Sequence, residues 1–103
     1  MVENLFTVPV PGGGETFRNL FENGCVAIEA IVSSDTPEPV LYDQPHDEWL
    51  LLLKGAATLW IEGETVDLKP GDTLHIPAHR RHKVVRTETG TRWLAIHLKG
   101  APC

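Results

Sequence analysis

Three side chains that can bind a metal ion lie beside apolar runs in the middle of this sequence. His46 and Glu48 precede a stretch of leucines, and His82 opens a second extended run a few residues after a proline. Imidazole nitrogens and carboxylate oxygens are common protein ligands of divalent transition metals. We therefore treat His46, Glu48 and His82 as candidate metal ligands.

Strand alternation gives the first two of these residues a common face. Successive side chains of a β-strand point to opposite faces, so His46, Glu48 and Leu50 share one face if this segment is extended. The aliphatic side chain of Leu50 indicates that this face is the interior. The opposite, outward face then carries Trp49, Leu51 and Leu53.

Two spacings in this region resemble the paired motifs that define the cupin superfamily. The end of the family's first motif is a glutamate, six residues and a glycine, which Glu48 and Gly55 match. The second motif is a glycine, five residues and a proline, followed by a histidine, which Gly71, Pro77 and His82 match. The resemblance implies a small β-barrel in which Glu48 and His82 are metal ligands.

The chain departs from the start of the first motif. The family has a histidine four or five residues before the glutamate and another two residues earlier. The corresponding positions here are Gln44 or Asp43, and Tyr42 or Leu41. We expect His46 to take over the lost ligand position, Gln44 to bind substrate and Tyr42 to act as an acid or base. Gln44 and Tyr42 face inward only if the strand stays regular through Pro45, which cannot donate to a ladder.

Further polar residues complete the expected site. His79 stands where the family has glycine and is expected at the pocket entrance as a substrate contact. Arg86 stands where the family often has asparagine, and on the inward face it would favour an anionic substrate or pair with Glu48. His97 lies in an apolar segment and is either a pocket base, a fourth ligand or a hydrogen-bonded histidine at a sheet surface. Alternation predicts an outward-facing His75.

The chain of 103 residues suits one compact domain. We expect an N-terminal arm over residues 1–15 and a single β-barrel domain over residues 16–103. Many short strand-like runs separated by turn residues predict an antiparallel all-β sandwich or barrel, and the resemblance implies the jelly roll, or double-stranded β-helix, of cupins. The expected strands are 16–21, 25–32, 40–42, 49–54, 57–62, 65–68, 73–76, 82–87 and 92–98.

Composition argues against two classes of partner. A formal net charge of −5 at pH 7 argues against nucleic-acid binding, and the basic run at 79–83 is too short to reverse this. The longest apolar run, residues 49–53, is far too short to span a membrane. The first residues lack the basic and apolar pattern of a secretory signal. We therefore expect a cytoplasmic protein in which Cys25 and Cys103 are reduced thiols.

The resemblance implies a metal-dependent protein that binds a small polar or anionic metabolite, with dioxygenase and isomerase chemistry both open. The expected cofactor is a divalent transition metal, namely Fe, Zn, Ni or Mn. A non-catalytic sensor of a small molecule or metal is the alternative, and an assembly module with a vestigial pocket is a third. We expect a homodimer, because small cupins commonly pair and the outward apolar face needs cover.

Overall fold

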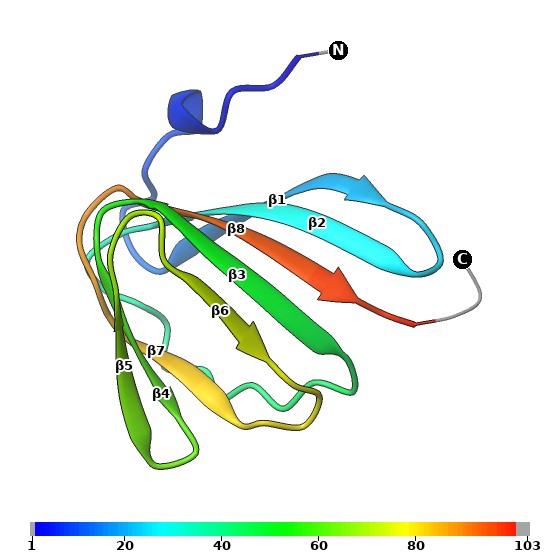
Figure 1. The fold of residues 1–103 in the computed structure, drawn as a ribbon. Helices are drawn as coiled ribbons and strands as arrows, with labels where there is room; N and C mark the ends of the chain where they lie inside the picture. The colour runs from blue at the N-terminus through cyan, green and yellow to red at the C-terminus, as the bar shows by residue number, and fades with distance from the viewer. Residues whose placement is uncertain (1, 101–103) are drawn as a thin grey trace.

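The computed structural model describes residues 2–100, which form two antiparallel sheets (Figure 1). A single 3-10 turn, η1 (Leu5–Thr7), precedes the strands β1 (Glu15–Glu22), β2 (Val26–Ser33), β3 (Asp47–Lys54), β4 (Ala57–Ile61), β5 (Glu64–Leu68), β6 (Thr73–Ile76), β7 (His82–Thr87) and β8 (Thr91–Leu98). The larger sheet has the order β1-β2-β8-β3-β6, and the smaller has the order β5-β4-β7. The predicted all-β jelly-roll architecture is confirmed.

The strand at 40–42 is the one expected strand that does not form within residues 2–100. Only Tyr42 pairs there, in an isolated bridge with His82 in which each backbone nitrogen donates to the other residue's carbonyl oxygen, at 2.8 and 3.1 Å. Pro39 and Pro45 flank this segment and have no N–H to donate, which limits its pairing. The other strands lie within two residues of their expected bounds.

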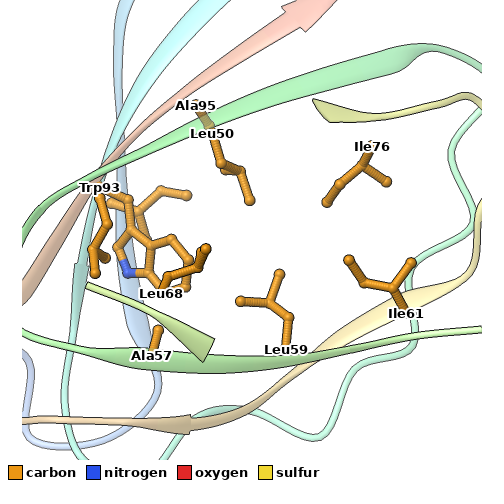
Figure 2. Packing of buried hydrophobic residues seen from close by; sticks show 10 residues of the cluster. Leu50, Ala57, Leu59, Ile61, Leu68, Ile76, Trp93 and Ala95 are labelled. Carbon is orange, nitrogen blue, oxygen red and sulfur yellow. The ribbon is translucent and has the colours of Figure 1, made fainter. Parts of the chain in front are cut away.

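The apolar core lies between the two sheets (Figure 2). Leu50 and Leu52 of β3 point into it and are 4% and 0% exposed, whereas Trp49 on the opposite face is only partly buried. The alternation predicted for β3 is therefore confirmed. Trp93 also lies in the core, where its indole nitrogen donates to the hydroxyl of Ser33 at 2.9 Å. This bond satisfies a buried donor and joins β8 to the end of β2.

The N-terminal segment packs on the outer face of the larger sheet. The guanidinium of Arg92, on β8, donates to the carbonyl oxygens of Leu5 and Val8 at 2.7 and 2.8 Å and lies over the ring of Phe6. Val8 is buried. Its Leu5–Thr7 part is a 3-10 turn capped by Asn4. It therefore covers one end of this face with residues of the same chain.

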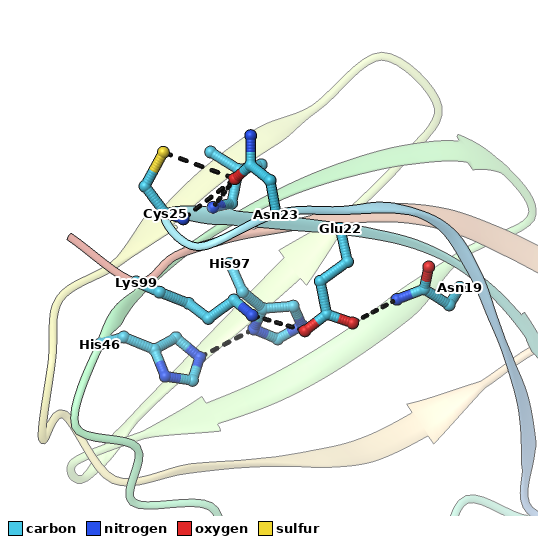
Figure 3. A network of polar contacts seen from close by, with 8 residues as sticks. Asn19, Glu22, Asn23, Cys25, His46, His97 and Lys99 are labelled. Carbon is cyan, nitrogen blue, oxygen red and sulfur yellow. Dashed lines mark hydrogen bonds and ion pairs between the residues drawn. The ribbon is translucent and has the colours of Figure 1, made fainter. Parts of the chain in front are cut away.

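Cys25 lies just before β2, where its backbone nitrogen donates to Asn23 Oδ1 at 2.9 Å (Figure 3). It is disulfide-bonded, so the expectation of a reduced thiol at this residue is wrong, and Cys103 lies outside the described residues. This removes one argument for a cytoplasmic location, which stays a prediction. Between residues 2 and 100, no helix has the length and apolar character needed to cross a membrane.

Both motif glycines adopt backbone conformations that favour glycine. Gly71 has φ of 91°, and the backbone nitrogen of Asp72 donates to the Lys69 carbonyl at 2.9 Å, as in a type II turn with glycine at its third position. Gly55 has φ of 89°, and a Cβ at this position would lie 2.3 Å from Thr91 Oγ1 and 2.8 Å from Thr91 Cα. The glycine that ends the first motif is therefore needed for the close approach of the β3–β4 turn to β8.

Replacing Gly55 with alanine tests this close approach. Gly55→Ala should lower the free energy of unfolding by about 3 kcal/mol or more, because backbone strain and a clash with Thr91 add together. Gly63→Ala is the matched control: Gly63 has φ of 94° but nothing within 4 Å of an added Cβ. Its loss should be about 1 kcal/mol from strain alone. Equal losses in urea denaturation of the two variants would show that the contact with Thr91 is unimportant.

Candidate metal and ligand site

A small cavity of about 90 Å³ lies between the two sheets. Apolar and aromatic side chains form most of its wall, and polar side chains reach it from β1, β2, β3, β7, β8 and the segment before β3. Its lining residues are Glu15, Phe17, Glu29, Ile31, Tyr42, Gln44, Glu48, Leu50, Leu59, His82, Val84, Trp93 and His97. The cavity is the place where titratable groups from both sheets meet.

Glu48 and His82 face each other across this cavity from different sheets. Glu48 lies near the start of β3, on the same face as Leu50, and His82 is the first residue of β7. Their side chains are only 9% and 6% exposed, and Glu48 Oε1 lies 3.8 Å from His82 Nε2. This separation is too long for a hydrogen bond. The Glu48 carboxylate and the His82 imidazole are thus both buried at the cavity wall and do not fill the space between them.

Local contacts set the orientation of His82. Its Nδ1 lies 2.8 Å from the carbonyl oxygen of Arg80, which can only accept, so Nδ1 carries a proton. In the neutral ring, the lone pair is therefore on Nε2 and points toward Glu48. Tyr42 stacks on the other side, with ring centroids 5.5 Å apart and planes at 23°. A backbone carbonyl that holds Nδ1 while Nε2 faces a cavity is the usual arrangement of a metal-binding histidine.

Gln44 and Tyr42 take the positions at which the family has histidines. The side-chain Nε2 of Gln44 donates to Glu48 Oε1 at 2.7 Å. The backbone carbonyl oxygen of Gln44 accepts from the backbone nitrogen of His79 at 2.7 Å. The side chains of Gln44 and Tyr42 both line the cavity, although residues 43–46 form no strand and the condition of a regular strand through Pro45 is not met. Burial raises the pKa of the Tyr42 phenol. The negative charge of nearby carboxylates, of which Glu15 has the largest effect, raises it further. Tyr42 is therefore a hydrogen-bond donor at neutral pH.

His46 contacts His97 rather than Glu48. His46 Nε2 lies 2.9 Å from His97 Nδ1 (Figure 3), and His97 Nε2 lies 2.9 Å from Glu29 Oε1. His97 and Glu29 line the cavity, whereas His46 does not. Within residues 2–100, no three His, Cys, Asp or Glu side chains converge closely enough to hold one metal ion. The structure thus brings two of the three predicted ligands together and places His46 in a second polar chain.

The pKa values of the two histidines in this hydrogen-bonded chain are shifted in opposite directions. The hydrogen bond to Glu29 raises the pKa of His97, although burial opposes it. Burial, and then the charge of neighbouring His97, lowers the pKa of His46. A proton shared by the pair therefore resides on His97, whose Nδ1–H then donates to the neutral His46. Sequence reasoning missed Glu29, although one signal was available: a carboxylate in phase with Ile31 in an otherwise apolar strand.

The remaining predicted residues lie outside this cavity. His79 has an exposed side chain, and its Nδ1 lies 2.9 Å from Asp43 Oδ1. Arg86 is exposed on β7 and lines a different surface pocket. His75 is exposed and lies 2.9 Å from an oxygen of Asp47, which confirms that it faces outward. The cavity wall therefore contains neither of the cationic side chains expected to contact a substrate.

The donor atoms at the cavity fit a divalent transition metal held by few protein groups. His82 Nε2 and the Glu48 carboxylate supply one nitrogen and one oxygen ligand of the kinds that Zn, Fe, Ni and Mn accept. The phenol of Tyr42 and the amide of Gln44 add oxygen atoms on the same wall. Such a site would keep several coordination positions for water or substrate, as catalytic rather than structural metal sites do.

Comparisons with known proteins identify the family of this chain. A protein-family model described as "Cupin domain" matches residues 32–97. The crystal structure of a Ralstonia eutropha JMP134 protein, described as a candidate mannose-6-phosphate isomerase, has 40% sequence identity and a TM-score of 0.85. That alignment covers 97% of this chain and 99% of the other.

Two curated relatives are dioxygenases. The 3-hydroxyanthranilate 3,4-dioxygenase of Burkholderia lata is 38% identical over 73 residues, which are 67% of this chain and 42% of that protein. The quercetin 2,3-dioxygenase of Bacillus subtilis is 31% identical over 74 residues, which are 68% of this chain and 22% of that protein. The chain thus spans less than half the length of these curated relatives. The family match over residues 32–97, together with the jelly-roll fold, shows that this chain belongs to the cupin family.

Proposed function

We propose that this protein is a small metal-dependent cupin that binds a small polar metabolite in the cavity between its sheets and transforms it by dioxygenase or isomerase chemistry. The observation that carries the proposal is the buried pair of Glu48 and His82, which face one cavity 3.8 Å apart without a hydrogen bond. The relationship to dioxygenases and to a candidate isomerase supports this range of reactions.

In this proposal, Glu48 and His82 hold Fe, Zn, Ni or Mn. Gln44 keeps the Glu48 carboxylate in place through its 2.7 Å hydrogen bond, and Arg80 does the same for His82 through its carbonyl oxygen. When bound, the metal supplies a Lewis acid or a redox centre. His46 joins the ligand set only if its contact with His97 breaks.

His97 and Tyr42 are the proposed acid–base groups. Glu29 accepts from His97 Nε2 and so fixes which nitrogen of the neutral ring carries the proton. The 2.9 Å contact of His97 Nδ1 with His46 Nε2 gives a second proton, taken up at Nδ1, a route away from the cavity. The protonated phenol of Tyr42 donates a hydrogen bond to an oxygen of the ligand. Gln44 is a ligand contact as well as a support for Glu48, because its side chain lines the cavity.

The alternative is a sensor that binds a metal or small molecule without turnover. It is favoured by the small number of strong ligands at the site, because within residues 2–100 no third His, Cys, Asp or Glu joins Glu48 and His82. The two functions share the same cavity and differ in what happens after binding. Turnover by the metal-loaded protein separates them.

Metal titration tests the ligand assignment. By calorimetry with Mn(II), Fe(II), Ni(II) and Zn(II), the protein should bind one equivalent of at least one metal. Glu48→Gln and His82→Asn should weaken binding at least tenfold, since loss of even a supporting group typically costs about 10–100-fold. His46→Asn is the matched control and should bind the metal unchanged. Loss of binding in His46→Asn, with Glu48→Gln unaffected, would contradict the assignment.

A following assay separates the enzyme from the sensor. Metabolites that stabilise the metal-loaded protein are incubated with it under air and under argon and analysed for products. A dioxygenase forms product only under air, and an isomerase forms it under both atmospheres. His97→Gln should retain the metal and lose turnover. Stabilisation with no product under either atmosphere would establish the sensor.

The outer face of the larger sheet supports a homodimer. Cross-strand neighbours on this face form apolar rows, one of which runs from Ile28 through Ile96 to Trp49 and another from Ala30 through Leu94 to Leu51. The N-terminal segment covers the end near Arg92 and reaches Arg18 through Glu3. The rows hold no charged side chain from β2 to β3, and Arg18 of β1 and His75 of β6 lie at their ends. Two copies of the face can therefore meet about a two-fold axis with these groups at the rim. We propose that a second copy covers it.

A charge placed in the centre of this face should separate the subunits. Leu51→Lys would bring two like charges close together across the two-fold axis, so we expect a monomer in light scattering after gel filtration. Val85→Lys is the control, since Val85 is 47% exposed on the smaller sheet. It should remain dimeric, and circular dichroism should show both variants folded. A wild-type monomer, or a Leu51→Lys dimer, would contradict the proposed interface.

A further inference from the structure

We propose that the cavity between the sheets takes a small cationic ligand, an amine or quaternary ammonium compound, rather than an anion. This inference extends the proposed function, because it names the class of ligand that the same cavity binds. It rests on the proposed function only for the reaction that the bound ligand undergoes. It replaces the expectation of an anionic metabolite, which depended on Arg86.

The charge of the cavity wall carries the first step. Three carboxylates, those of Glu15, Glu29 and Glu48, line the cavity, and none of its lining residues within the described part of the chain is lysine or arginine. His97, which holds the proton that it shares with His46, balances the charge of Glu29, and Glu15 and Glu48 keep the wall negative. Arg86 is on another surface. An anionic group entering here would meet like charge in a partly desolvated space, where electrostatic repulsion is stronger than in water. A cation would instead be attracted by the wall.

An unsatisfied acceptor in the wall indicates a ligand that donates a hydrogen bond or carries a positive charge. Glu15 Oε2 is buried and accepts no hydrogen bond. A buried acceptor without a partner is costly unless a donor or cation satisfies it. A cationic ligand therefore supplies what the Glu15 carboxylate lacks.

Aromatic rings complete the wall. Phe17, Tyr42 and Trp93 line the cavity beside the carboxylates, and Trp93 is only 2% exposed. The negative face of an aromatic ring attracts ammonium groups, most strongly where water is excluded. The combination of carboxylates and aromatic rings is thus suited to a positively charged nitrogen, whereas apolar rings alone would favour a neutral ligand.

Metal binding reduces this preference. A divalent ion held by Glu48 and His82 would offset the two negative charges that His97 leaves unbalanced, so the metal-free cavity is the one that discriminates most strongly by charge. The volume of about 90 Å³ corresponds to roughly six to nine water positions at 10–15 Å³ each. The ligand portion inside the cavity therefore has on the order of six to nine non-hydrogen atoms.

The test compares three probes of nearly the same shape and different charge. Choline is cationic, 3,3-dimethylbutan-1-ol is its neutral isostere, and 3,3-dimethylbutyrate is anionic. Amide chemical shifts are followed in metal-free and Zn(II)-loaded protein. In the metal-free protein, choline should bind at least about tenfold more tightly than the neutral alcohol, as expected for a charge in a partly desolvated site, and the butyrate most weakly. In the Zn(II)-loaded protein this preference should be smaller. The shifts should map to the residues that line the cavity.

Variants identify the carboxylates responsible. Glu15→Gln and Glu29→Gln should each weaken choline binding severalfold and leave the neutral alcohol unaffected. Glu64→Gln is the matched control, because Glu64 is an exposed carboxylate on β5 outside the cavity. Equal affinity for choline and the alcohol, tighter binding of the butyrate, no binding of any probe, or an equal effect of Glu64→Gln would overturn the inference.

The metal titration is performed on the same samples, so the two proposals can fail separately. A protein that binds choline with these preferences but takes up no metal would contradict the proposed metal centre and support the cationic ligand. A protein that binds metal through Glu48 and His82 but discriminates against choline would do the reverse. His82→Asn removes a metal ligand without changing the number of carboxylates, and it should therefore retain the preference for choline over the alcohol.

Discussion

The site of this protein depends on the burial of two ionisable side chains that face each other from different sheets. Glu48 and His82 are 9% and 6% exposed at their side chains and lie 3.8 Å apart. Burial of such groups is unfavourable unless their polar atoms find partners. Gln44 and the carbonyl of Arg80 satisfy part of this requirement, and the part that remains faces the cavity. What the cavity binds must therefore satisfy a carboxylate and an imidazole lone pair together.

The fold brings these groups together through a few backbone features. The bridge between Tyr42 and His82 fixes the start of β7 beside the segment that precedes β3, and alternation along β3 turns Glu48 inward with Leu50. The close approach of Gly55 to Thr91 lets the chain turn from β3 into β4 next to β8. Each feature corresponds to a residue type visible in the sequence, which is why the motif spacings predicted the barrel and its two central site residues.

Local sequence patterns did not predict those parts of the site that depend on how neighbouring strands pair. His46 has the same parity as Glu48, but it lies just outside β3, and its ring meets His97 instead. His97 could not be placed from its own strand, because both faces of that strand carry apolar residues. Its inward position follows from pairing with Glu48 in β3 and with Ala27 in β2. Arg86 shows the same limit, since a register shift between β4 and β7 occurs beside its partner Thr58. Alternation along one strand contains no information about such partners.

Crystals grown with Mn(II) and measured for anomalous scattering test the central claim most directly, since they locate the metal without reference to activity. The account predicts one strong anomalous peak in the cavity, within coordination distance of His82 Nε2 and a carboxylate oxygen of Glu48, with His46 still bonded to His97. A peak held by His46 and His97, or full occupancy elsewhere on the surface with the cavity empty, would contradict it.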